Sequence, residues 1–186
     1  MSELHLHELP LRGLFSLQHK RHEDARGQFS RLFCEGSLGA LGTPFHVRQI
    51  NHSCTRGEGS VRGLHYQQGD VPEAKLITCL RGEVWDVAVD LRPDSPTFLH
   101  WHAEHLRAGD GRSLLVPAGF AHGFQVLSDD AELLYLHSAD YAPGKEGGLS
   151  VHDPRLAIAW PLPVKNLSAR DAAHPGLDQH FAGVCP

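Results

Sequence analysis

The chain has 186 residues, of which 41% are hydrophobic and 21% charged, a composition typical of one globular domain with a real core. Its formal net charge is −5 and its acidic residues are scattered, which disfavours nucleic acid and anionic membranes as partners. We find neither a long apolar run nor a charged-then-apolar leader, and the four cysteines form no C-x-x-C pair. These features predict a reduced, cytoplasmic protein without a membrane span.

Alternating apolar and polar residues predict short β-strands along most of the chain. Turns containing Gly or Pro separate them, which indicates an all-β fold, a sandwich or jelly roll, in a single domain over residues 1–186. The start is expected to be irregular, residues 37–43 to form a loop, and Ser168 to cap a short helix near the C-terminus. The expected strands cover 13–18, 28–33, 45–52, 61–67, 75–80, 84–91, 97–106, 113–116, 120–127 and 132–138.

The stretch from Val61 to Lys75 concentrates chemically useful side chains, among them Arg62, His65 and Gln67. On a strand, successive side chains point to opposite faces, so His65 would face one side and its apolar neighbours the other. An imidazole, an ammonium and a guanidinium that converge on one cavity would bind an anionic, carbonyl-bearing molecule. The alternative is a solvated strand with an exposed histidine.

Pro117 to His122 has the form P-x-G-x-x-H, which resembles the second motif of the cupin superfamily. Many cupins bind a metal through this histidine and an H-x-H pair, but His65 to Gln67 has glutamine in the second position. Glutamine is a poor ligand for a transition metal, so we expect acid–base chemistry with no metal and no cofactor. His100 and His102 share one face of a predicted strand, where an adventitious metal site is the alternative to solvation.

A series of segments in order along the chain resembles the dTDP-4-dehydrorhamnose 3,5-epimerase family. They are residues 26–27, 49–53, 62–67, 75–76, 81–92, 95–98, 117–124, 126–128, 131–135, 153–154, 160–161 and 167–173. The resemblance implies a cupin-type jelly roll and a homodimer that exchanges N-terminal strands. It also implies inversion at C3, C5 or both of a nucleotide-linked 4-keto-6-deoxyhexose during deoxysugar biosynthesis.

The family's catalytic roles map onto four residues of this chain. By resemblance, His65 takes the proton next to the ketone, Asp171 orients His65, and Tyr135 delivers a proton from the other side. Lys75 would stabilise the enolate oxygen at C4. The implied substrate-binding residues are Arg26, Gln49, Asn51, Arg62, Gln67, His122, Glu146 and Arg170, with Arg26 acting in the neighbouring subunit's site.

Alternatives remain at the level of the residues and of the whole protein. Tyr135 could be a packed core aromatic, Asp171 a helix cap, and Arg62 the partner of a structural carboxylate. A metal-dependent cupin oxygenase or isomerase, and a non-catalytic sugar-nucleotide binding protein, are the competing functions. Arg31 stands where the family commonly has Glu and His22 replaces an aromatic residue, which predicts a carrier nucleotide other than dTDP.

Overall fold

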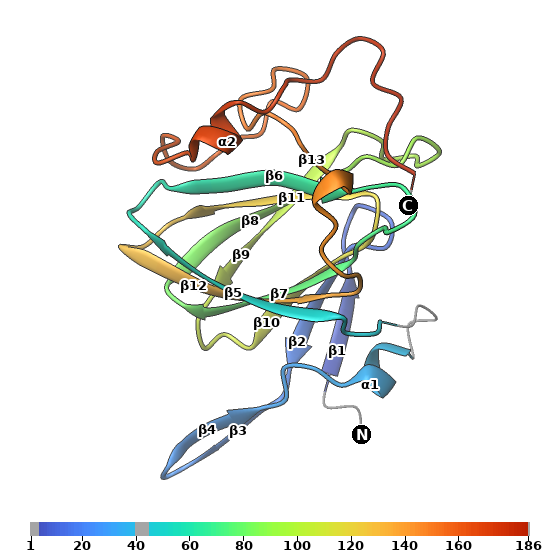
Figure 1. Cartoon of the computed structure of the whole chain (residues 1–186). Coiled ribbons are helices and arrows are strands. Elements are labelled where there is room, and N and C mark those ends of the chain that lie inside the picture. The colour runs from blue at the N-terminus through green and yellow to red at the C-terminus, as the bar shows by residue number, and fades with distance from the viewer. Residues whose placement is uncertain (1–3, 40–44, 186) are drawn as a thin grey trace.

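Two antiparallel β-sheets pack face to face in the computed structural model, which describes residues 4–39 and 45–185 (Figure 1). The six-stranded sheet has the spatial order β1 (Leu4–Glu8), β2 (Phe15–His19), β10 (Arg112–Val116), β7 (Lys75–Arg81), β12 (Asp130–His137) and β5 (Gln49–Arg56). The five-stranded sheet has the order β13 (Glu146–Gly148), β6 (Val61–Gln67), β11 (Phe120–Val126), β8 (Glu83–Asp90) and β9 (Trp101–Arg107). The expected all-β jelly-roll sandwich is therefore confirmed.

The main core lies between the two sheets. Ile77 and Leu133 come from the six-stranded sheet, Val84 and Phe124 from the five-stranded sheet, and all four are buried in one cluster. Burying each such side chain contributes about 1.5–3 kcal/mol, which explains why the alternating strands close on one another.

The chain after Leu149 covers the outer face of the five-stranded sheet, where Val87 and Val89 pack against Val151 and Leu156. β8 is consequently covered on both faces. In this segment α2 (Ala169–Ala172) begins after Ser168, whose hydroxyl accepts the N–H of Asp171, as the sequence predicts.

β7 and β8 are consecutive strands that belong to different sheets. The single residue between them is Gly82, at φ +71°, where a Cβ atom would lie 2.0 Å from the carbonyl oxygen of Asp130. Glycine is needed at this crossing, and it lets the chain pass from one sheet to the other without a loop.

The N-terminal third differs most from the expectation. The predicted strand 28–33 ends at Ser30, because β3 (Arg21–Asp24) and β4 (Gly27–Ser30) form a hairpin that extends away from the sandwich and leaves Phe29 65% exposed (Figure 1). Part of the predicted loop 37–43 is helix α1 (Glu35–Gly39), while its residues 40–43 lie outside the described part of the chain. The start of the chain was expected to be irregular, but β1 forms there and pairs with β2.

Other strand boundaries also shift. β5 begins four residues later than expected, at Gln49, because Phe45 packs in an apolar cluster with Leu38 on the outer side of the six-stranded sheet. β9 begins at Trp101, after a turn in which Leu99 has φ 62°. A 3₁₀ turn at Pro143–Lys145 and strand β13 were missed altogether. Among the described residues, no helix has the length and apolar character needed to cross a membrane.

Candidate functional site

A cavity of about 280 Å³ lies between the sheets and receives side chains from both. β5, β7 and β12 supply residues from the six-stranded sheet, and β6, β11 and β13 supply residues from the five-stranded sheet. The lining residues are Gln49, Asn51, His52, Ser53, Arg62, His65, Tyr66, Gln67, Glu73, Lys75, His122, Phe124, Tyr135, His137, Tyr141 and Glu146.

His65 on β6 is held by a carboxylate from the C-terminal helix. Its Nε2 lies 2.8 Å from Oδ1 of Asp171, whose second oxygen accepts the backbone N–H of Gly63 at 3.3 Å. Ser168 caps α2 through its own hydroxyl, so the carboxylate of Asp171 is not the helix cap. A carboxylate that accepts Nε2–H leaves Nδ1 as the nitrogen able to take a proton.

Burial and hydrogen bonding together set the protonation of this pair. Desolvation lowers the pKa of His65 below its usual 6.5, although the bond to Asp171 acts in the opposite direction. Burial opposes ionisation of Asp171, but the hydrogen bonds from His65, Gly63 and Ser168 outweigh it and lower the pKa of the carboxyl group. The pair is therefore a neutral imidazole beside an ionised carboxylate, the state that a general base needs.

Tyr135 enters the cavity from β12, in the sheet opposite that of His65. Its hydroxyl lies 3.4 Å from Oγ of Ser53, and its ring contacts His122 edge-on and His137 face-on. Burial raises the pKa of Tyr135 well above its usual 10, which keeps the phenol protonated and able to donate.

His122 is the neighbour of His65 across the β6–β11 pairing and has a carboxylate partner of its own. Its Nε2 lies 2.8 Å from Oδ1 of Asp86, a completely buried residue of β8. The hydrogen bond fixes the orientation of the His122 ring in the cavity wall.

Lys75 begins β7 and reaches toward the other sheet. Its Nζ donates to the backbone oxygen of His65 at 3.5 Å and lies 3.3 Å from Oε2 of Glu73. The other oxygen of Glu73 lies 2.8 Å from Nδ1 of His137. Although burial opposes it, the His137 ring and the Lys75 ammonium lower the pKa of Glu73, so this carboxylate is ionised and holds the ammonium beside the cavity.

At one end of the cavity, the lining side chains are held by hydrogen bonds and an ion pair. Glu146 accepts from the Tyr141 hydroxyl at 3.0 Å and from Arg170 at 2.7 Å. Gln49 accepts the backbone N–H of Tyr141. Arg170 does not line the cavity itself and is connected to the site only through its ion pair with Glu146.

Two further sequence-predicted binding residues line the cavity from neighbouring strands. Arg62 donates through Nε to Thr55 at 2.8 Å, and Asn51 lies 3.3 Å from Nε2 of His137. The partner of Arg62 is thus a hydroxyl group rather than a structural carboxylate.

Two arginines named by the sequence analysis lie elsewhere in the single chain. Arg26 is at the tip of the β3–β4 hairpin, where it pairs with Asp24 at 2.6 Å. Arg31 borders a small separate hollow beside Leu4 and Phe33. Neither lines the cavity around His65.

Comparison with known proteins decides the family. The model of the dTDP-4-dehydrorhamnose 3,5-epimerase family matches residues 8–179. The chain belongs to this family. A family member named dTDP-4-dehydrorhamnose 3,5-epimerase from Streptomyces griseus is 42% identical over 181 residues, which cover 96% of this chain and 90% of the relative. The Salmonella typhimurium protein of the same name is also 42% identical, over 88% of this chain and 90% of its own.

Solved structures of the epimerase family agree with the fold. The Legionella pneumophila enzyme, solved in complex with dTDP-4-keto-L-rhamnose, has a TM-score of 0.90 at 36% identity and covers 98% of this chain and 99% of its own. A 4-keto-6-deoxy sugar epimerase from the novobiocin gene cluster of Streptomyces spheroides has a TM-score of 0.89 at 36% identity, over 94% of this chain and 88% of its own.

The cupin metal set does not fit this epimerase cavity. Gln67 donates to the backbone oxygens of Val71 and Asp140 and accepts the N–H of Ala142, so its amide serves the local backbone. Nε2 of His65 and Nε2 of His122 each face a carboxylate. With the Gln67 amide committed to the local backbone, the second ligand of the cupin H-x-H pair is missing and the cupin metal set is incomplete.

Sequence reasoning missed several residues that shape the site: Ser53, Glu73, Asp86, His137 and Tyr141. His137 shares strand parity with Tyr135, a signal that could have placed it on the same face. Asp86 carries no such signal, because its partner His122 follows 36 residues later in the chain.

Proposed function

We propose that the protein is a metal-free epimerase that inverts C3, C5 or both of a nucleoside-diphosphate-linked 4-keto-6-deoxyhexose. The observation that carries the proposal is the entry of His65 and Tyr135 into one cavity from opposite sheets. Inversion requires that one group remove a proton from one face of the sugar and another return a proton to the opposite face. Two side chains on one strand face would approach the sugar from the same side.

In the proposed reaction, Nδ1 of His65 removes the proton next to the ketone, and the bonding electrons move to the carbonyl oxygen. Lys75 stabilises the resulting enolate, a type of contribution worth about 10²–10³-fold in rate. Tyr135 then donates its proton to the carbon from the other face. Asp171 keeps the His65 ring in the tautomer that this sequence requires.

The substrate class follows from the relatives and from the charges around the cavity. The relatives carry dTDP-4-dehydrorhamnose in their names, and one structure is in complex with a dTDP-keto sugar. Arg62 lines the cavity and is suited to an anionic diphosphate. Because these relatives are named for dTDP-linked sugars, we propose the dTDP-linked sugar as substrate, against the prediction from the sequence.

The test is NMR-followed incorporation of deuterium from D₂O into C3 and C5 of dTDP-4-keto-6-deoxyglucose. We expect exchange by the wild type and none by His65→Ala, with His102→Ala as a matched control on a strand away from the cavity. A non-catalytic binding protein would bind the nucleotide sugar without exchanging either position. Absence of wild-type exchange would reject the enzyme proposal.

The proposal extends to a homodimer of single-domain chains in which the N-terminal β3–β4 hairpin serves the neighbouring site. Its projection from the sandwich and the position of Arg26 at its tip support this arrangement (Figure 1). Mixing inactive Arg26→Ala with inactive His65→Ala chains, followed by subunit exchange, should restore activity because one site in each mixed dimer is intact. If Arg26 acts in its own chain's site, mixing restores nothing.

A further inference from the structure

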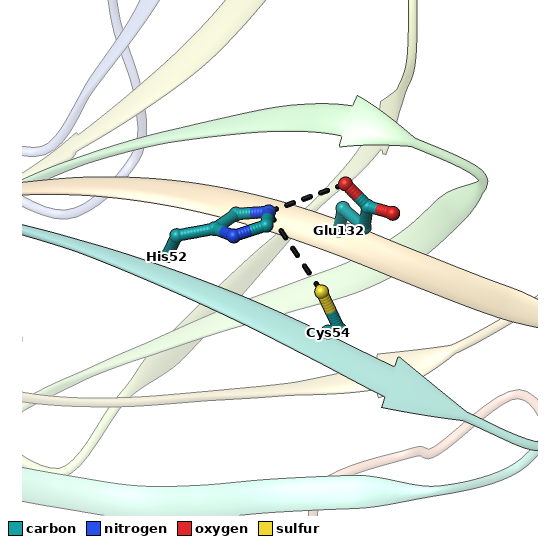
Figure 2. A group of neighbouring side chains, drawn as sticks. All are labelled: His52, Cys54 and Glu132. Carbon is teal, nitrogen blue, oxygen red and sulfur yellow. Dashed lines mark hydrogen bonds and ion pairs between the residues drawn. The ribbon is translucent and has the colours of Figure 1, made fainter.

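A second cluster of chemically active side chains lies outside the proposed catalytic machinery, on β5 and β12. It consists of His52, Cys54 and Glu132, whose ligand atoms all lie within 4.8 Å of one another (Figure 2). By strand alternation, His52 and Cys54 share one face of β5, and Asn51 and Ser53 share the other. His52 also borders the cavity, whereas Cys54 and Glu132 do not line it.

The strand register builds the cluster. Cys54 and Glu132 are direct cross-strand partners in the antiparallel β5–β12 pair, and His52 is two residues from Cys54 on the same face. Opposed residues of this kind have Cβ atoms about 4.5–5.5 Å apart, which suits side chains that share one ion. The backbone of two paired strands, rather than a flexible loop, fixes all three side chains.

The spacing of the ligand atoms matches a tetrahedral metal ion. Bond lengths of about 2.0–2.2 Å to N and O and 2.3 Å to S place tetrahedral N and O ligands about 3.3–3.5 Å apart, and N and S ligands about 3.6 Å apart. Here Nε2 of His52 lies 3.2 Å from Oε2 of Glu132 and 3.9 Å from Sγ of Cys54. Both distances lie within a few tenths of an ångström of the tetrahedral values, and the sulfur of Cys54 lies within 4.8 Å of the Glu132 carboxylate.

The surroundings fit a cation of charge +2. The thiolate of Cys54 and the carboxylate of Glu132 together balance that charge, and the neutral imidazole of His52 adds none. Arg81 lies 3.6 Å from Oε1 of Glu132, the oxygen that does not face His52. It therefore orients the carboxylate from behind, as outer-shell partners of metal ligands do.

We propose that His52, Cys54 and Glu132 form a binding site for Zn²⁺ or a similar borderline divalent ion, with a water molecule as fourth ligand. The mixed nitrogen, sulfur and oxygen set selects such an ion over Mg²⁺ and Ca²⁺, which take oxygen ligands. The ion would join β5, the edge strand of the six-stranded sheet, to β12. His52 borders the catalytic cavity, but none of the three ligands has a role in the proposed epimerase chemistry, so the site does not depend on that chemistry.

Co²⁺ titration of the reduced, metal-depleted full-length protein tests the site, because a thiolate ligand gives a near-ultraviolet charge-transfer band. We expect one Co²⁺ per chain, displaced by Zn²⁺, and no charge-transfer band in Cys54→Ser. His52→Gln and Glu132→Gln should weaken binding by at least about 10–100-fold, the loss typical even of an outer-shell partner. Cys34→Ser and Cys185→Ser are the matched thiol controls and should bind as the wild type does.

Thermal unfolding provides a second readout that does not depend on cobalt. Zn²⁺ should raise the melting temperature of the wild type in a concentration-dependent way, and should not raise that of Cys54→Ser, whose metal-free melting temperature checks its folding. His174→Gln alters the other group of candidate ligands, His65, Asp171 and His174, and should leave the cobalt band intact. Absence of the band in the wild type, or its persistence in Cys54→Ser, would overturn the proposal.

Discussion

Replacing Asp171 by asparagine tests the central link between structure and chemistry. The two oxygens of Asp171 accept from two donors, Nε2–H of His65 at 2.8 Å and the N–H of Gly63 at 3.3 Å. A carboxamide offers only one oxygen. If that oxygen faces Gly63, the NH₂ group faces His65 and forces the proton onto Nδ1, which removes the base.

The expected loss follows from the role of the base. General acid–base catalysis contributes about 10²–10⁴-fold, so the exchange rate at saturating substrate should fall by that factor, about 2.7–5.4 kcal/mol in activation free energy. Substrate binding should change little, because the carboxylate of Asp171 acts through His65.

The pH profile distinguishes this role from a structural one. His65 must be neutral to accept a proton, so the wild-type rate falls as the pH drops through the pKa of His65, which lies below 6.5. The carboxylate raises that pKa while burial lowers it. In Asp171→Asn only the lowering effects of burial and of the Lys75 and Arg170 charges remain, and the acidic limb of the residual activity should move to lower pH.

Ser168→Ala is the matched control. It removes the helix cap, at a cost of about 0.5–2 kcal/mol in stability, but leaves the carboxylate of Asp171 in the chain. The control should keep the wild-type acidic limb. Wild-type exchange rates in a folded Asp171→Asn protein, or an identical pH shift in Ser168→Ala, would refute the assigned role.

Three further substitutions address the other groups. Tyr135→Phe should lower the rate of completed inversion by about 10²–10⁴-fold while exchange at the first carbon continues, and equal losses in the NMR assay would contradict the assigned order of proton transfers. Lys75→Met should lower kcat by about 10²–10³-fold, as measured by steady-state kinetics, and an unchanged kcat would exclude it from enolate stabilisation. Asp90→Asn should cost about 3–5 kcal/mol in urea unfolding, because this fully buried carboxylate accepts from Arg92 and Ser95, and a small cost would show that the network is dispensable.

The strands that carry the chemistry could be predicted from the sequence because their patterns are local. Alternation over 61–67 and 84–91 is visible in single strands, and β6 and β8 follow it. The assignment of β7 and β8 to different sheets could not be predicted, since two strands around a one-residue turn look the same in sequence whether or not they pair.

The candidate site was predictable where the family resemblance reached and hidden where a residue supports another through a long-range contact outside that resemblance. His65, Lys75 and Tyr135 were recognised from the family resemblance, and they line one cavity. Asp86 is a polar residue in an alternating strand, and alternation alone does not show that it is buried. It is buried because it meets His122, a long-range pairing that no local pattern encodes.

The attachment of Asp171 to His65 has a consequence for how activity arises during synthesis. All strands of both sheets precede residue 149, whereas the carboxylate that orients the base lies 23 positions from the last residue of strand β13. Since domains fold as the chain emerges from the N-terminus, a nascent protein can assemble its β-sandwich while its base is still unoriented. Enzymatic competence would then appear only when the tail docks and the aspartate reaches the imidazole.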